Sequence, residues 1–194
     1  MAAEQPAVLA QALAAARSIT GDYTRVRVLG SLAPGLPPEL FPQALAAVFA
    51  MPGGSGRAEA LAALAPRLPP DLLAQALAAA TAITDNSGRA EALISLVPHL
   101  PADQQGGALS QALAAASRTG SETRVKVLKT ARSAHFRDGS GSYVHLLRDS
   151  LSGIDRTVCL RVIEAAAPAI SEIGGGAAIQ QCVDAIVAAH RWWP

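Results

Sequence analysis

The feature that most constrains the fold is an internal repeat with a period of about 32 residues. The segment Gln-Ala-Leu-Ala-Ala occurs four times, and its copies begin at residues 11, 43, 75 and 111. A second anchor, Arg-x-x-x-Leu, follows each copy, with its arginine at Arg25, Arg57, Arg89 and Arg124. A third anchor, Leu-Ala/Val-Pro-x-Leu-Pro, covers residues 32–37, 64–69 and 96–101. Three anchors that recur in the same order at the same period predict an array of equivalent structural units.

Each unit has the pattern of two helices joined by a short turn. In the third unit, Leu73, Leu77 and Ala80 are spaced i, i+4 and i+7, which places them on one face of a first helix. Leu93 and Leu96 continue the same periodicity in a second helix. Prolines followed by an acidic residue separate the units, and both suit the first turn of a helix. The unit is therefore expected to be a helical hairpin.

The composition favours helices over strands. The chain of 194 residues contains 43 alanines, whereas aromatic residues make up only 4%. Alanine is the strongest helix former, and strands favour β-branched and aromatic residues. A chain that is 51% hydrophobic with a formal net charge of +1 can bury a core, which excludes a disordered protein. We therefore expect an all-α fold.

A hairpin of about 32 residues cannot bury its apolar face alone, so successive hairpins are expected to stack into an α-solenoid. The repeat units predict four hairpins within residues 1–132, at about 6–37, 38–69, 70–101 and 102–132. A glycine- and serine-rich loop is expected at 133–142. The remaining segment, 143–194, is expected to be a degenerate repeat with a terminal capping helix, with helices at 143–153, 155–173 and 177–191.

Charge and hydropathy exclude several classes of protein. A formal charge of +1 lacks the basic excess typical of nucleic-acid binding, so nucleic acid is not the expected partner. The sequence contains no run of 18 apolar residues, so a membrane-spanning helix is not expected. Its first residues also lack the basic segment with which a secretory signal begins. We expect a soluble, cytoplasmic protein. Cys159 and Cys182 form no Cys-x-x-Cys pair and are expected to be free core thiols.

The sequence contains no motif that identifies a reaction. The histidines lack metal-ligand spacing, and they occur at His99, His135, His145 and His190. No Gly-x-Ser-x-Gly or phosphate-binding loop motif is present. Gly174–176 is expected to end a helix rather than to bind an anion. A hydrolase that uses His135 and Ser142 in the 133–145 loop is the weakest hypothesis, and we expect no enzyme, metal or cofactor.

Two sets of residues are candidate binding groups. The equivalent arginines Arg25, Arg57, Arg89 and Arg124 would form a ladder in a stack, either as an anion-binding stripe or as a repeated structural hydrogen-bonding position. Trp192 and Trp193 are adjacent near the end of the chain, where they are either an exposed binding anchor or a cover for the last helix. A second ladder is expected to form hydrogen bonds between repeats, and it comprises Gln11, Gln43, Gln75 and Gln111.

The unit that runs through Gln-Ala-Leu-Ala-Ala, Ile-Thr-Asp, Arg-Ala-Glu-Ala-Leu and Leu-x-Pro-x-Leu-Pro resembles a helical repeat of the tetratricopeptide or HEAT type. More specifically, it resembles the C-terminal repeat arms of bacterial STAND-type ATPases with NACHT or related modules. The ending Arg191-Trp192-Trp193-Pro194 is similar to endings of such arms. The resemblance implies an arm that senses a partner, without the ATPase module.

The sequence therefore predicts a non-enzymatic scaffold that binds or senses a protein partner along the solenoid surface. The alternative is a reader of nucleic acid or another polyanion through the arginine ladder, whose affinity would fall steeply with salt. The sequence names neither the partner nor the oligomeric state.

Overall fold

The computed structural model describes residues 4–135, 151 and 156–190, and every regular element within them is a helix. This confirms the all-α prediction. Four pairs of α-helices follow one another along the chain. The pairs are α1 (Glu4–Ser18) with α2 (Asp22–Leu32), α3 (Phe41–Phe49) with α4 (Gly54–Leu64), α5 (Pro70–Thr81) with α6 (Asn86–Leu96), and α7 (Ala102–Ala116) with α8 (Ser121–His135).

The proline-containing anchor forms the connection between one pair and the next. In each of three connections, the first half of the anchor is a single 3₁₀ turn with proline near its beginning. These turns are η1 (Ala33–Gly35), η3 (Ala65–Arg67) and η4 (Val97–His99). The following leucine has extended backbone and a buried side chain, as Leu36 shows with 1% exposure. Proline fixes φ and removes an N–H donor, so it ends the preceding helix. A further 3₁₀ turn, η2 (Pro38–Leu40), leads into α3.

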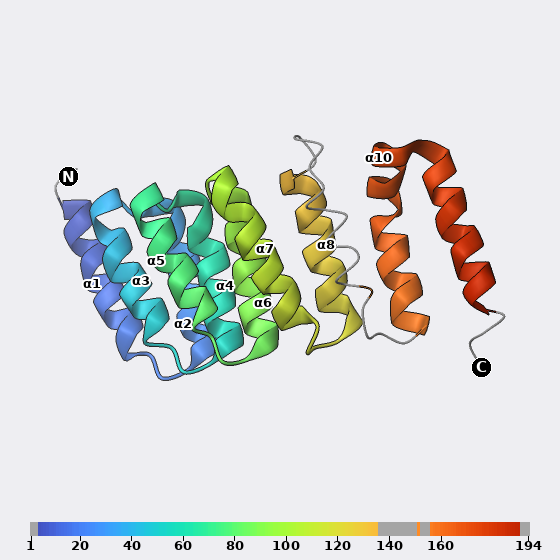
Figure 1. Cartoon of the computed structure of the whole chain (residues 1–194). Coiled ribbons are helices and arrows are strands. Elements are labelled where there is room, and N and C mark those ends of the chain that lie inside the picture. The colour runs from blue at the N-terminus through green and yellow to red at the C-terminus, as the bar shows by residue number, and fades with distance from the viewer. Residues whose placement is uncertain (1–3, 136–150, 152–155, 191–194) are drawn as a thin grey trace.

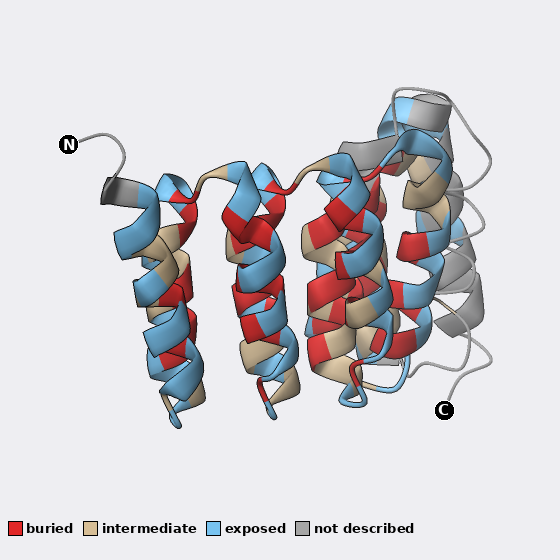
Figure 2. Ribbon diagram, turned by 90° about the vertical axis from the view of Figure 1, so that its left-hand side faces the viewer, coloured by how far each residue is buried: buried red, intermediate tan, exposed pale blue. Residues whose placement is uncertain are grey.

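The paired helices lie in two layers (Figure 1). Helices α2, α4, α6 and α8 contact one another in sequence, and α1, α3 and α5 do the same in the other layer. The buried residues form one continuous core along the described stack, and Figure 2 shows them on the helix sides that face neighbouring helices. The core consists largely of alanine and leucine, so it depends on close approach of the helices rather than on bulky aromatic side chains.

The N-termini of α4 and α6 lie very close together. A Cβ atom added to Gly88 would lie 2.6 Å from the carbonyl carbon of Gly54 and 2.8 Å from its oxygen. At the same place the Asp85 carboxylate caps α6 by accepting a hydrogen bond of 2.6 Å from the Gly88 backbone N–H. Only glycine leaves room at position 88 for both the contact and the cap.

The C-terminal part differs from the expected helices. Helix α8 continues through His135 and so includes the first three residues of the expected loop at 133–142; the other residues of that loop are outside the described ranges. The expected helix at 143–153 also lies outside them, apart from Leu151, which is helical. The helices expected at 155–173 and 177–191 fall, within the described residues, in one helical element, α10 (Arg156–His190).

Helix α10 packs against α8, and Figure 1 shows its ribbon folding back on itself. Pro168 and the glycines at 174–176 lie within it, and proline and glycine are common causes of helix kinks. The three glycines were expected to end a helix, but residues 174–176 are helical and lie inside α10. None of the helices in the described ranges is long and apolar enough to cross a membrane.

Candidate functional site

The arginine ladder is directed into the turns that join the two helices of each pair. The Arg25 Nε atom donates a hydrogen bond of 3.0 Å to the Ile19 carbonyl, and Arg25 Nη2 donates to the same oxygen. Arg89 Nη1 repeats this bond to the Ile83 carbonyl at 3.2 Å. Both acceptors lie just beyond the end of the preceding helix, where a cation complements the negative end of the helix dipole.

The other two arginines make related bonds. Arg57 Nη2 lies 3.4 Å from the Pro52 carbonyl, and Arg124 Nη2 lies 2.6 Å from the Ser117 carbonyl. Arg25 and Arg124 are only 7% exposed, whereas Arg57 and Arg89 are half-buried. The ladder therefore ties the start of each second helix to the end of the first. This geometry favours the structural alternative over an anion-binding stripe.

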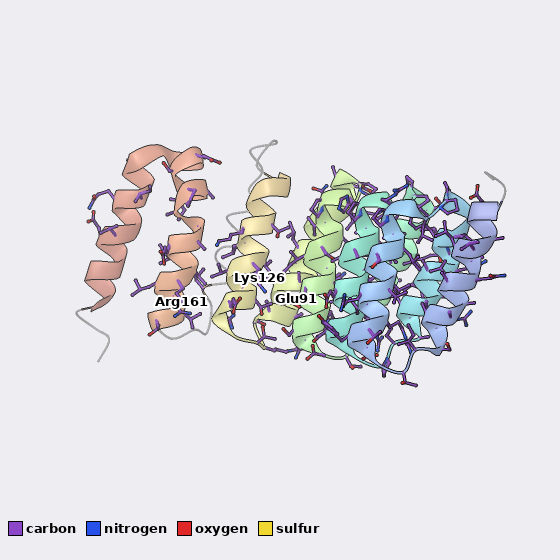
Figure 3. All side chains as sticks on the ribbon, turned by 180° about the vertical axis from the view of Figure 1, so that it is seen from behind. Glu91, Lys126 and Arg161 are labelled. Carbon is purple, nitrogen blue, oxygen red and sulfur yellow. The ribbon has the colours of Figure 1, made fainter. Side chains whose placement is uncertain are left out.

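A second set of charged residues lies two positions after each ladder arginine and faces outward. We call it the outer row; it consists of Arg27 on α2, Glu59 on α4, Glu91 on α6 and Lys126 on α8. Lys126 Nζ forms ion pairs with Glu91 at 3.3 Å and with Glu122 at 3.7 Å. Figure 3 labels Glu91 and Lys126, and it also labels Arg161 on the neighbouring helix α10, which is likewise exposed.

The outer row differs from the ladder in one informative respect. All four ladder positions carry arginine, whereas the outer row carries both signs of charge at equivalent positions. At its α2 end, the Arg27 guanidinium lies 5.9 Å from the centre of the Tyr23 ring, and Tyr23 is 70% exposed. In the sequence, the outer row can be recognised as a position that recurs in every helix pair but does not carry the same charged residue in each.

Other polar groups connect one pair to the next. The Thr81 hydroxyl on α5 lies 3.1 Å from Gln111 Oε1 on α7, so one member of the glutamine ladder makes the expected contact between repeats. The Gly53 N–H at the start of α4 donates to the Asp22 carboxylate on α2 at 3.1 Å. Arg67 Nη1 donates to the Pro34 carbonyl across the same boundary. These bonds hold the pairs in a fixed register.

The remaining candidates lie only partly within the residues that the structure describes. Within residues 4–135, 151 and 156–190, no three His, Cys, Asp or Glu residues are placed to hold a metal ion. Cys159 is a free, half-buried thiol, and desolvation by burial raises its pKa. His145, Ser142, Trp192 and Trp193 lie outside the described ranges.

The chain was compared with models of known families, with curated proteins and with solved structures, and none of the three comparisons gave a match.

Proposed function

We propose that the chain is an α-solenoid of helical hairpins that acts as a non-enzymatic scaffold for a protein partner. The partner lies across the outward face of α2, α4, α6 and α8 and contacts the outer row. In the setting suggested by the resemblance to STAND-type arms, this contact senses the partner for a separate ATPase. The proposal includes a cytoplasmic location.

The proposal rests on a difference between two kinds of equivalent position: those that carry the same residue in every helix pair and those whose residue differs among the pairs. The repeated arginines bond to backbone carbonyls inside the pairs, as Arg25 does with Ile19. The unrepeated charges of the outer row stay in contact with solvent: the Lys126 side chain is 50% exposed and that of Glu91 39%. In a repeat protein the repeated residues build the stack, and surface residues that vary between units provide specificity for a partner.

The polyanion alternative has no observation in its favour. A stripe that neutralises phosphates requires guanidinium groups that face solvent, and those of Arg25 and Arg124 are buried. The outer row offers acidic Glu59 and Glu91 between its cations, which would repel a phosphate backbone. A protein surface with both signs of charge fits this row better than a polyanion does.

Site-specific photocrosslinking tests this function. A photoreactive residue replaces Glu59 in one variant and Gln43 in a matched control; both positions are exposed, but Gln43 lies on α3, in the other layer. In a lysate of the source organism, position 59 is expected to give a discrete protein crosslink that resists nuclease, and position 43 is expected to give none. Equal crosslinking from both positions would contradict the proposed face. Crosslinks that disappear with nuclease would favour the polyanion alternative.

A further inference from the structure

The first helix pair exposes residues at positions that are buried in the later pairs. On α1, Val8 is three residues before the Gln-Ala-Leu-Ala-Ala anchor and is 61% exposed. The equivalent residues of the next three pairs are buried: Leu40 is 7% exposed, Leu72 6% and Ala108 2%. Val8 therefore lies on a side of α1 that is built for packing but is uncovered in the structure.

Helix α2 shows the same contrast. Thr24, Val28 and Ser31 line a shallow hollow together with Arg27. In α4 the equivalent positions face α2: a Cβ on Gly56 would lie 3.7 Å from Val26, and Ala63 lies 3.8 Å from a Cβ placed on Gly30. The positions equivalent to Val28 are fully buried in each later pair, at Ala60, Ala92 and Val127.

These residues define a head face, which consists of Val8 on α1 and Thr24, Arg27, Val28 and Ser31 on α2. On α2, Thr24, Val28 and Ser31 occupy the positions at which later pairs meet their predecessors, whereas Arg27 belongs to the outer row and lies beside them. Terminal repeats of stacked proteins ordinarily carry a polar outer surface that prevents further stacking. The head face carries polar Thr24, Arg27 and Ser31, but it also exposes a large apolar side chain at Val8.

The last helix also exposes aliphatic side chains. Leu160 and Val183 on α10 are 41% and 44% exposed. With Val8 and Tyr23, they make up four of the five exposed large hydrophobic residues in the described ranges, and the fifth is Phe49. Among the described residues, four of these five therefore lie on the first helix pair and on α10. We call the exposed pair Val183 and Asp184 on α10 the tail patch.

We propose that the head face of one copy binds the tail patch of a second copy, so that the stack continues from one molecule to the next. Within the chain, each interface joins the leading side of one pair to the trailing side of another, so two unlike surfaces meet. A second copy offers such an unlike surface at its opposite end. The charges also match, because Arg27 lies beside Val28 on the head face and Asp184 follows Val183 in the tail patch.

A contact between unlike faces leaves one head and one tail free in every dimer. Such heterologous association continues into chains or closes into a ring, in contrast to a two-fold dimer, which stops at two. The wild-type protein is therefore expected to form species larger than one 19.8 kDa chain, and their size is expected to increase with concentration. A two-fold contact between two head faces would yield a dimer and nothing larger.

Sedimentation velocity with blocked ends tests the proposal. The double variant Val8→Asp with Val28→Asp blocks the head, and Val183→Asp blocks the tail; Ala78→Asp, at an exposed position in the middle of the stack on α5, is the matched control. Each blocked variant alone is expected to be monomeric, the control is expected to assemble like the wild type, and an equimolar mixture of the two blocked variants is expected to give a one-to-one dimer. Circular dichroism verifies that each variant keeps its helices.

Three results would overturn the proposal. The first is a wild-type protein that stays monomeric at every concentration. The second is a tail-blocked variant that still dimerises, because that outcome requires contact between two heads. The third is a mixture of folded, blocked variants that remains monomeric.

A charge exchange gives a second, milder test that leaves the apolar residues in place. Arg27→Glu or Asp184→Arg alone is expected to weaken association by about fivefold, a magnitude typical of one exposed ion pair. The two changes combined in one chain are expected to restore it, because every contact then regains opposite charges. Failure of the folded double variant to recover would show that these two residues do not meet.

Discussion

The replacement of Gly88 by alanine tests the packing of the stack at a point where α4 and α6 lie very close together. The added methyl group would lie 2.6 Å from the carbonyl carbon of Gly54, a distance that real Cβ contacts do not show. The obstacle is backbone, so no side-chain rotation relieves it. Either the start of α4 must move away from α6, or the first turn of α6 must tilt and lose the hydrogen bond between Gly88 and Asp85.

The expected cost follows from these two responses. Inserting a methyl group into a packed interface typically costs about 1–3 kcal/mol. Loss of an N-cap hydrogen bond costs about 1 kcal/mol more. The free energy of unfolding should therefore decrease by about 1–4 kcal/mol, depending on whether the cap is also lost, which for a chain of this length lowers Tm by about 2–16 °C.

The matched control is Gly107→Ala in α7, where an added Cβ meets nothing within 4 Å. Alanine is favoured over glycine inside a helix, so this variant should gain about 0.5–1 kcal/mol. Urea unfolding followed by circular dichroism measures both variants. A Gly88→Ala protein as stable as the wild type would refute the close approach of α4 and α6.

Three further predictions concern the ladder, the outer row and Cys159. Arg25→Met should lower the free energy of unfolding by about 2 kcal/mol, because a buried, charged hydrogen bond is lost. The control Arg17→Met, at an exposed position, should change it by less than about 0.5 kcal/mol. Urea unfolding measures both variants. Lys126→Met should cost less than about 1 kcal/mol, and 1 M salt should abolish the difference from the wild type. In a Cys182→Ser background, iodoacetamide should alkylate Cys159 more slowly than an unstructured thiol at the same pH, because burial raises the Cys159 pKa and leaves less thiolate; equal rates across an alkaline pH series would contradict this.

The sequence predicted the helix pairs well because their signals are local. The periodicity of leucine and alanine placed the first eight α-helices, and the proline anchors placed the turns between them. The sequence identified the ladder arginines as a set, but it did not show in which direction their side chains point. Whether Arg25 faces solvent or the Ile19 carbonyl depends on how two helices meet, which spacing alone does not determine.

The C-terminal part was predicted less well for a physical reason. The glycines at 174–176 were expected to end a helix, yet glycine also accepts helical backbone when its neighbours continue the helix, and α10 continues through them. The sequence shows that Val8 is equivalent to Leu40 and Leu72. It does not show that Leu40 and Leu72 are buried while Val8 is exposed, so the head face could not be predicted.

Small-angle X-ray scattering tests the central claim, that the chain is an open stack of helical hairpins. The Val183→Asp variant is the sample, because a blocked tail removes association from the measurement. A compact domain of 194 residues has a radius of gyration of about 16 Å. The account predicts a radius clearly above that value, with a pair-distance distribution that extends in a long tail. A radius of about 16 Å with a symmetric distribution would contradict the stack and the surfaces inferred from it.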